Sequence, residues 1–212
     1  MPTHLVNLDA LIQREDFESG KAESGSNEPL FKVEELASGK LYYKVLRKPD
    51  FQRDTSNWDA QTILEVVRSF LDGELIPALI LWHSKDTNKV FVIDGAHRLS
   101  ALIAWVNDDY GDGPISQKFF NFRVPEAQKK FHRETKMLID KEIGSFQQLL
   151  HIGLNEETAP DPTKLRRARA IATKQPPIQK VEGDAKIAET SFFKINGNQT
   201  AIDATELDII RA

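Results

Sequence analysis

The chain has 212 residues and a formal net charge of −4, with 40% hydrophobic and 28% charged residues. This is enough chain for one domain with a substantial core, and the composition is ordinary for a globular protein. Because there is no cysteine, disulfides, a thiol nucleophile and cysteine-ligated zinc or iron–sulfur sites are excluded. The negative charge gives no general reason to bind nucleic acid, so such binding would need a local basic patch.

The N-terminal region has neither a basic segment followed by an apolar one nor a run of about 18 apolar residues. We therefore expect a cytoplasmic protein with no membrane partner. Residues 5–12 form a short apolar segment, and residues 13–29 are charged, with Ser and Gly near their end. Residues 1–30 are accordingly predicted to be an N-terminal lead and a flexible loop.

A short strand is expected over 40–45, and the stretch Pro49–Arg53 is expected to be an extended loop because the residue before a proline avoids the α region. A helix follows, with Ser56 or Asn57 as its cap and Gly73 as its stop. Its apolar face is marked, at helical spacing, by Ile63, Val67 and Phe70.

Two buried strands, 76–82 and 90–93, are separated by a polar stretch that is long enough for a hairpin loop. A helix with a one-sided apolar stripe follows over 98–107, and then an Asp- and Gly-rich loop over 108–114. The remainder is predicted to be mostly helical. The expected helices there are 125–141, 145–151, 163–174, 185–195 and 204–211.

The predicted fold class is therefore α+β, with a small mixed sheet and helices followed by a mostly helical C-terminal half. We expect an α/β core over 31–115 and a helical extension over 116–212, within one structural domain. The last helix has no stop signal, so the chain could end in mid-element as a fragment of a larger protein with a downstream effector domain.

The most prominent candidate site is the corner between the strand at 90–93 and the following helix, which holds Asp94, Gly95, His97 and Arg98. The first turn of a helix has unpaired amide donors, glycine allows a ligand to approach the backbone, and arginine adds a planar cation. These features favour a phosphate site, in which His97 donates a hydrogen bond or relays a proton and Asp94 caps the helix or holds a metal ion.

The simpler interpretation of the corner is equally open. Asp94 would be only an N-cap, Gly95 a turn residue, and His97 and Arg98 exposed residues of the first turn. Arginine in a first turn is mildly unfavourable with the helix dipole, and a bound anion would explain its presence.

Three further groups of residues have a functional and a structural interpretation. Gln52 and Arg53 precede Trp58 and could clamp a phosphate or a base, although a surface ion pair is the favoured interpretation when they are taken alone. Residues 190–199 contain two phenylalanines that are expected to pack, and Asn196 and Gln199 supply polar groups after them. Taken alone, this segment is best explained as a capped helix end, with Gly197 as the C-cap.

The run 164–180 contains six basic residues and no acidic residue. It could contact a nucleic-acid backbone without sequence preference, although a solvated helix face is the more common explanation. The predicted contacts on this helix are Lys164, Arg166, Arg167 and Arg169. The five histidines show no metal-ligand spacing, and no Walker A loop, G-x-S-x-G elbow or H-E-x-x-H motif is present.

Three separated motifs resemble the ParB/sulfiredoxin-like superfamily. They are Phe51-Gln52-Arg53 with Trp58, then Ile93-Asp-Gly-Ala-His-Arg-Leu-Ser-Ala-Leu102, then Phe192-Phe-Lys-Ile-Asn-Gly-Asn-Gln199. The closest branches are the DGQHR-domain proteins, which are DndB-like, and the N-terminal domain of GmrSD-type restriction enzymes. The resemblance covers about residues 40–212.

The resemblance implies a nucleotide-binding domain that serves a DNA-directed bacterial system such as restriction, DNA modification or phage defence. It implies a phosphate site made of Asp94, Gly95, Ala96, His97 and Arg98. Of these, Asp94, His97 and Arg98 would be catalytic if a ribonucleoside triphosphate is hydrolysed, and Asp94 would be the ligand of Mg²⁺.

The other two motifs complete the implied pocket, with Gln52 and Arg53 on one flank and Asn196 and Gln199 closing it. Ala96 replaces the glutamine that is usual in the central motif, so binding is expected before hydrolysis. The absence of cysteine excludes sulfiredoxin-type chemistry.

Two other functions remain open. In the first, the protein is a DndB-like, DNA-binding transcriptional regulator without catalysis. In the second, less favoured one, it is a ParB-like nuclease that uses Asp94, His97 and an aspartate from 108–112. Nucleotide and DNA are the expected ligands, together with a homodimer or a partner effector domain.

Overall fold

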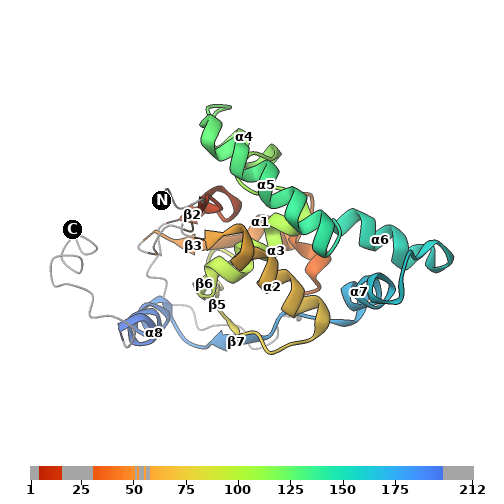
Figure 1. Cartoon of the computed structure of the whole chain (residues 1–212). Coiled ribbons are helices and arrows are strands. Elements are labelled where there is room, and N and C mark those ends of the chain that lie inside the picture. Colours follow the sequence, from red (N-terminus) through yellow and green to blue (C-terminus); the bar gives the residue numbers. More distant parts are fainter. Residues whose placement is uncertain (1–4, 16–30, 51, 53–54, 56–57, 198–212) are drawn as a thin grey trace.

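The computed structural model describes residues 5–15, 31–50, 52, 55 and 58–197 (Figure 1). Its centre is a five-stranded mixed sheet. In spatial order the strands are β2 (Arg14–Glu15), β3 (Leu46–Pro49), β6 (Lys89–Asp94), β5 (Leu79–Ser84) and β7 (Ile178–Val181). The first three strands are parallel, β5 is antiparallel to β6, and β7 is parallel to β5.

A second, antiparallel pair joins β1 (Leu5–Val6) to β4 (Trp58–Asp59). The helices lie around the sheets. They are α1 (Leu41–Val45), α2 (Ala60–Asp72), α3 (Ala96–Asn107), α4 (Pro114–Phe119), α5 (Glu126–Glu142), α6 (Phe146–Leu154), α7 (Pro162–Thr173) and α8 (Ala185–Gly197), with 3₁₀ turns η1 (Asp9–Leu11), η2 (Val33–Leu36) and η3 (Glu156–Thr158). The predicted α+β class is confirmed.

The central strand β6 is buried on both faces, and its side chains alternate between two apolar clusters. Val90 and Val92 join the main core, which contains α2 and α3, whereas Phe91 and Ile93 face the second cluster. Helix α8 completes that second cluster with Ala185, Ala188 and Phe192. Because side chains of a strand alternate with a period of two, a wholly apolar strand needs cover on both sides, and α8 supplies the second cover.

Helix α2 has the apolar face that its sequence predicts, but a different N-cap. Ile63, Val67 and Phe70 are buried, and Gly73 ends the helix in the left-handed conformation with φ of 80°. The cap is Asp59, whose carboxylate accepts the Thr62 amide, so the expected cap at Ser56 or Asn57 is wrong. Because the helix begins only at Ala60, Trp58 and Asp59 remain extended and pair with β1.

The strand expected over 40–45 is also wrong, because residues 41–45 form the single helical turn α1 and the strand starts at Leu46. The aromatic residues that favour a strand make tertiary contacts instead. Tyr42 stacks on Phe31, and the Tyr43 hydroxyl donates to the Leu11 carbonyl at 2.9 Å. Burial, together with the Asp109 carboxylate, raises the pKa of Tyr43 to about 12, which keeps this donor protonated.

Other elements differ from expectation in extent. The strand predicted over 76–82 is β5, shifted to Leu79–Ser84, and the antiparallel hairpin with β6 is as expected. Helix α4 and strand β7 were not predicted. The helix predicted over 204–211 lies outside the described residues. Part of the expected N-terminal lead belongs to the core, since Val6, Leu8 and Leu11 are buried.

Helices α2, α5 and α7 are joined by one buried guanidinium. Arg167 forms two hydrogen bonds with the Asp72 carboxylate, at 3.0 and 2.8 Å, and donates to the Glu142 carbonyl at 2.9 Å. The hydrogen bond and the charge of Arg167 outweigh burial and lower the pKa of Asp72. Only 10% of the Arg167 side chain is exposed, so this pair is a structural element of the core.

We predict that Arg167→Gln lowers the free energy of unfolding by about 3 kcal/mol, because it removes the buried partner of the Asp72 carboxylate and leaves only the exposed Arg166 to pair with it. The matched control is Arg169→Gln on the same helix, whose ion pair with Glu156 is exposed and should contribute less than about 0.5 kcal/mol. Urea denaturation of both variants measures the difference. Equal losses would contradict the structural role of Arg167.

Candidate functional site

The corner predicted from the sequence is a tight turn between β6 and α3. Gly95 is the N-cap of α3, has φ of 88° and receives no side-chain cap. A Cβ atom at this position would lie 2.8 Å from Leu79 Cδ2 and 3.0 Å from Arg98 Nη2. The position therefore needs glycine both for its left-handed backbone and for the close packing around it.

Arg98 and Asp94 face each other across this turn. Arg98 Nη2 donates to Asp94 Oδ2 at 2.9 Å and to the Ala78 carbonyl at 3.1 Å. The N-cap interpretation of Asp94 is thus wrong, because its carboxylate serves as the counter-ion of Arg98. This ion pair by itself offsets the unfavourable position of an arginine in the first turn, so a bound anion is not needed to explain it.

The Arg98 guanidinium nevertheless has a hydrogen-bond donor that is not satisfied within the described part of the chain. Both contacts of Arg98 come from Nη2, whereas Nε is buried and has no hydrogen-bond partner among the described residues. A buried donor without a partner costs about 1–3 kcal/mol, so such atoms are few in native proteins and mark places where a ligand can bind.

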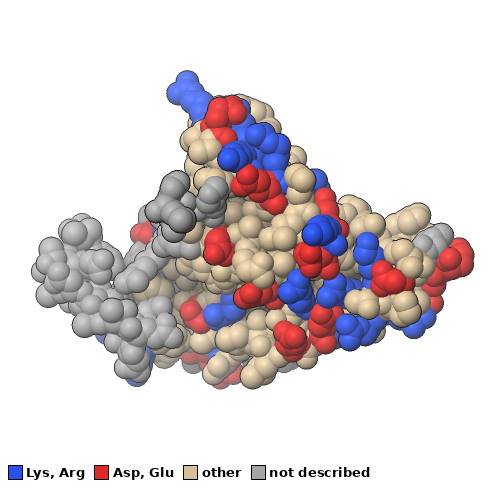
Figure 2. All heavy atoms as spheres, in the orientation of Figure 1, with Lys and Arg blue, Asp and Glu red and all other residues tan. Residues whose placement is uncertain are grey.

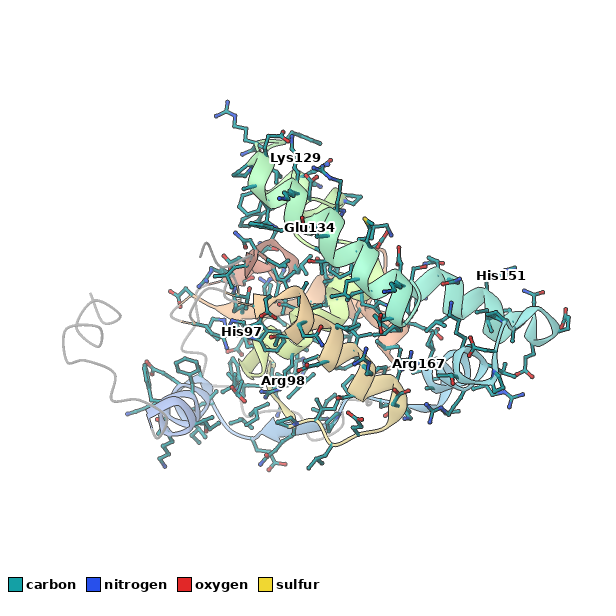
Figure 3. All side chains as sticks on the ribbon, viewed as in Figure 1. His97, Arg98, Lys129, Glu134, His151 and Arg167 are labelled. Carbon is teal, nitrogen blue, oxygen red and sulfur yellow. The ribbon has the colours of Figure 1, made fainter. Side chains whose placement is uncertain are left out.

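His97 is held by an aromatic contact. Its ring stacks on Trp58, with the ring centroids 5.3 Å apart and the planes inclined by 23°. Trp58 lies in β4, directly before α2. The contact brings Trp58 of the first sequence motif against His97 of the second. Figure 3 shows His97 and Arg98 in the same part of the molecule, well separated from Arg167.

The loop of Gln52 lies at the same edge of the sheet as this corner. Strands β3 and β6 are parallel, with Leu46 opposite Val90, so their carboxyl ends lead to neighbouring loops. Gln52 Oε1 is buried and, like Arg98 Nε, has no partner among the described residues. Arg53 lies outside the described residues.

A network of charged side chains positions the loop that contains Gln52. Lys48, which is fully buried at the end of β3, pairs with the Asp9 carboxylate and donates to Thr55 Oγ1 at 3.5 Å. Arg14 pairs with the same carboxylate at 3.2 Å, and its Nη1 donates to the Gln52 carbonyl at 2.5 Å. The backbone at Gln52 and at Thr55 is therefore attached to this charged network.

Sequence reasoning missed this network. Lys48 stands between Arg47 and Pro49, and nothing in this local pattern shows that it is buried. Its counter-ion Asp9, and Arg14, which pairs with the same carboxylate, lie about 35–40 positions earlier in the chain. Burial raises the pKa of Asp9, but Lys48, Arg14 and the Thr55 amide together outweigh it and lower the pKa.

The third sequence motif is described only in part. Phe192 is buried and packs edge-to-face against Phe193 at 5.4 Å, as expected. These residues attach α8 to the face of β6 that carries Phe91 and Ile93. Asn196 lies in the last turn of α8, but the structure does not describe its side chain, and Gln199 lies outside the described residues. Their closure of the pocket stays a prediction.

The basic run on α7 is not the open positive face that the sequence suggests. Arg167 is buried, Arg166 pairs with Asp72 at 3.1 Å, and Arg169 pairs with Glu156 at 2.5 Å. A groove of about 460 Å³ lies beside these residues, between α7 and the end of α2. Its lining consists of Leu71, Asp72, Pro162, Leu165, Arg166, Arg169, Ala170, Thr173 and Lys174, so it is separate from the corner at Asp94.

The described residues contain no group of three or more His, Cys, Asp or Glu side chains arranged to hold a metal ion. Within the same part of the chain, no helix is long and apolar enough to cross a membrane. A cation at the corner would have one protein carboxylate, Asp94. This fits Mg²⁺, which commonly keeps several waters and binds through one or two carboxylates plus phosphate oxygens.

Comparison with known proteins defines the class to which this fold and site belong. Residues 33–211 match the family model described as GmrSD restriction endonuclease, N-terminal domain, so the chain belongs to that family. It is therefore a restriction-endonuclease-associated domain of a DNA-directed defence system. Comparisons with curated proteins and with solved structures returned no match.

We predict that Gly95→Ala lowers the free energy of unfolding by about 2 kcal/mol, because alanine is strained at this φ and its Cβ meets Leu79. The control is Gly39→Ala, which has open space around the added methyl group and should change stability by less than about 0.5 kcal/mol. Thermal unfolding compares the two. An unchanged melting temperature for Gly95→Ala would contradict the geometry of the turn.

We further predict that Asp9→Asn destabilises the protein by about 3 kcal/mol at neutral pH, since it leaves Lys48 buried without its counter-ion. Because the pKa of Asp9 is lowered in the folded state, the stabilisation by its carboxylate is complete above its unfolded pKa of about 4 and is lost as the pH falls through the folded value.

Denaturation of the wild type and of Asp9→Asn across this pH range tests the prediction. The difference between the two proteins should shrink in acid. The control, Asp86→Asn, changes an exposed residue and should show no pH-dependent difference. A difference for Asp9→Asn that persists undiminished at low pH would refute the role of the carboxylate.

Proposed function

We propose that this domain binds a ribonucleoside triphosphate, together with Mg²⁺, at the corner formed by Asp94, Gly95, Ala96, His97 and Arg98, and that it has a ParB-like architecture. In the DNA-directed system to which its family belongs, nucleotide binding would regulate action on DNA. Hydrolysis is a second step of the proposal, with His97 and Arg98 beside the phosphates.

One observation carries the proposal. A buried donor, Arg98 Nε, and a buried acceptor, Gln52 Oε1, both lack partners among the described residues and follow the carboxyl ends of two adjacent parallel strands. A phosphate oxygen accepts from a guanidinium but cannot donate to an amide oxygen, whereas a ribose hydroxyl or a base amino group can. A nucleotide supplies both kinds of group in one molecule.

The surroundings are suited to the same ligand. The uncapped first turn of α3 offers backbone amides and a partial positive charge to phosphate oxygens. Gly95 has no side chain to obstruct their approach. Asp94 uses Oδ2 for Arg98, which leaves Oδ1 for the Mg²⁺ that would accompany the phosphates and reduce their charge.

The chain's own residues would then have distinct tasks. Arg98 would donate to a phosphate oxygen while Asp94 keeps its guanidinium in place. His97, whose ring is oriented by Trp58, would donate a hydrogen bond or relay a proton. Arg53, Asn196 and Gln199 remain predicted contributors to the same pocket.

Titration of the chain with each of the four ribonucleoside triphosphates, with and without Mg²⁺, tests the proposal. We expect at least one to bind, Arg98→Ala to weaken that binding by roughly 10- to 100-fold through loss of a charged hydrogen bond, and removal of Mg²⁺ to weaken it further. Phosphate release by the wild type and by Asp94→Ala measures hydrolysis separately.

The matched control is Arg68→Ala, which removes a solvent-accessible arginine of α2 that pairs with Glu142 and should leave binding unchanged. If none of the four nucleotides binds, or if Arg98→Ala binds as tightly as the wild type, the proposal fails.

A further inference from the structure

The turn between α4 and α5 exposes two aromatic side chains on a projecting part of the molecule. Helix α4 and the beginning of α5 project from the remaining helices at the top of Figure 1. Phe119 and Phe122 are 51% and 77% exposed. Large apolar side chains that are grouped on a surface mark an interaction site more often than isolated ones do.

The backbone holds these side chains outward. Asn121 and Phe122 both have left-handed backbone angles, with φ of 49° and 60°, which is uncommon for a bulky residue. The turn is closed by the Phe122 amide, which donates to the Gln117 carbonyl at 2.7 Å, and by the Arg123 amide, which donates to the Phe120 carbonyl at 2.9 Å.

The base of the projection is rigid as well. The buried Asp109 carboxylate accepts hydrogen bonds from the Gly113 amide at 2.9 Å, the Ser116 amide at 2.9 Å and the Ser116 hydroxyl at 2.7 Å. These bonds satisfy the first turn of α4 and attach it to the end of α3. The exposed phenylalanines therefore lie on an ordered support.

Basic residues surround the aromatic pair. Between residues 118 and 134 the chain has five Lys and Arg residues and two Glu residues, although the whole chain is negatively charged. Figure 2 shows Lys and Arg side chains gathered on this projection, with a few acidic ones among them. The five are Lys118, Arg123, Lys129, Lys130 and Arg133.

The arrangement on α5 concentrates the positive charge. Lys129 and Lys130 lie four and three residues before Arg133, so all three are close on the helix surface. Lys129 pairs with Glu126 at 2.6 Å and Lys130 with Glu134 at 3.7 Å (Figure 3 labels Lys129 and Glu134). These are surface pairs of small energy, which a stronger polyanion can replace.

We propose that this projection, residues 118–133, is a DNA-contact surface of the domain. The cations would contact backbone phosphates, and Phe119 and Phe122 would contact bases or sugars where the strand is accessible. Clustered cations with interleaved exposed aromatics suit nucleic acid, which combines regularly spaced phosphates with stackable rings. Helix α7 has no aromatic side chain, and its Arg167 is buried against Asp72, so it is the less suitable surface.

The projection is attached to the N-terminal segment that also supports the candidate nucleotide site. The side-chain amide of Gln128 in α5 accepts from the Asn7 amide at 3.3 Å and donates to the Tyr110 carbonyl at 3.2 Å. Asn7 lies between β1, which pairs with the strand of Trp58, and η1, which contains Asp9. The DNA-contact surface would thus be linked to the corner at Asp94 by a chain of contacts, from Gln128 to Asn7, from β1 to β4, and from Trp58 to His97.

Fluorescence anisotropy with labelled duplex and single-stranded DNA, across salt concentrations, tests the assignment on the full chain. Lys130→Gln/Arg133→Gln should weaken binding roughly tenfold and reduce the slope of log affinity against log salt by about 2, because two phosphate contacts are lost. Phe119→Ser/Phe122→Ser should weaken binding by a similar factor with the slope unchanged, since stacking is not ionic.

Two controls separate the alternatives. Arg166→Gln/Arg169→Gln removes two exposed arginines of α7 and should leave DNA affinity within twofold of the wild type. Thermal unfolding should be nearly unchanged for both projection variants, because the substituted side chains are exposed. Nucleotide affinity should also be retained, which separates this result from the test of Arg98.

Several outcomes would overturn the assignment. These are no DNA binding by the wild type, loss of binding only in the α7 variant, or projection variants that bind DNA normally but no longer bind vesicles containing anionic lipid. The relative affinity for duplex and single strand identifies the form of DNA that is bound.

Discussion

The parallel pairing of β3 with β6 is the constraint on which the candidate site depends. It brings the chain after Pro49 and the chain after Asp94 to one edge of the sheet, although more than 40 residues separate them. The buried Lys48–Asp9 pair then joins the end of β3 to the N-terminal segment. Without this register, Gln52 and Arg98 would not follow the carboxyl ends of neighbouring strands.

The polar groups at this edge fall into two classes. Lys48, Asp9 and Arg14 satisfy one another and maintain the loop, as expected for buried charges that are costly when unpaired. Arg98 Nε and Gln52 Oε1 are not satisfied among the described residues. The same contrast separates Arg167, whose guanidinium is fully engaged in the core, from the arginine of the corner. Arg98 is paired with Asp94 through Nη2, so the difference lies in its Nε, which has no partner among the described residues.

Local patterns predicted the elements that local physics controls. The apolar spacing of Ile63, Val67 and Phe70, the glycine stop at Gly73 and the doubly buried strand at 90–93 were all predicted correctly. The errors occur where distant contacts dominate. Residues 41–45 form a helical turn because Tyr42 and Tyr43 contact Phe31 and Leu11, and the start of α2 is set by the pairing of β4 with β1.

The sequence by itself determined the strand–glycine–helix corner at Asp94–Arg98, because a wholly apolar strand, a residue with unrestricted φ and an amphipathic helix are local properties. It also identified the family. Only the tertiary structure decided which charged side chains are paired and buried. Arg98 pairs with Asp94, Arg167 with Asp72, and Lys48 with Asp9. Each ion pair depends on how separate elements pack. Ion pairing and burial are properties of position in space, and the order of residues in a chain does not contain them directly.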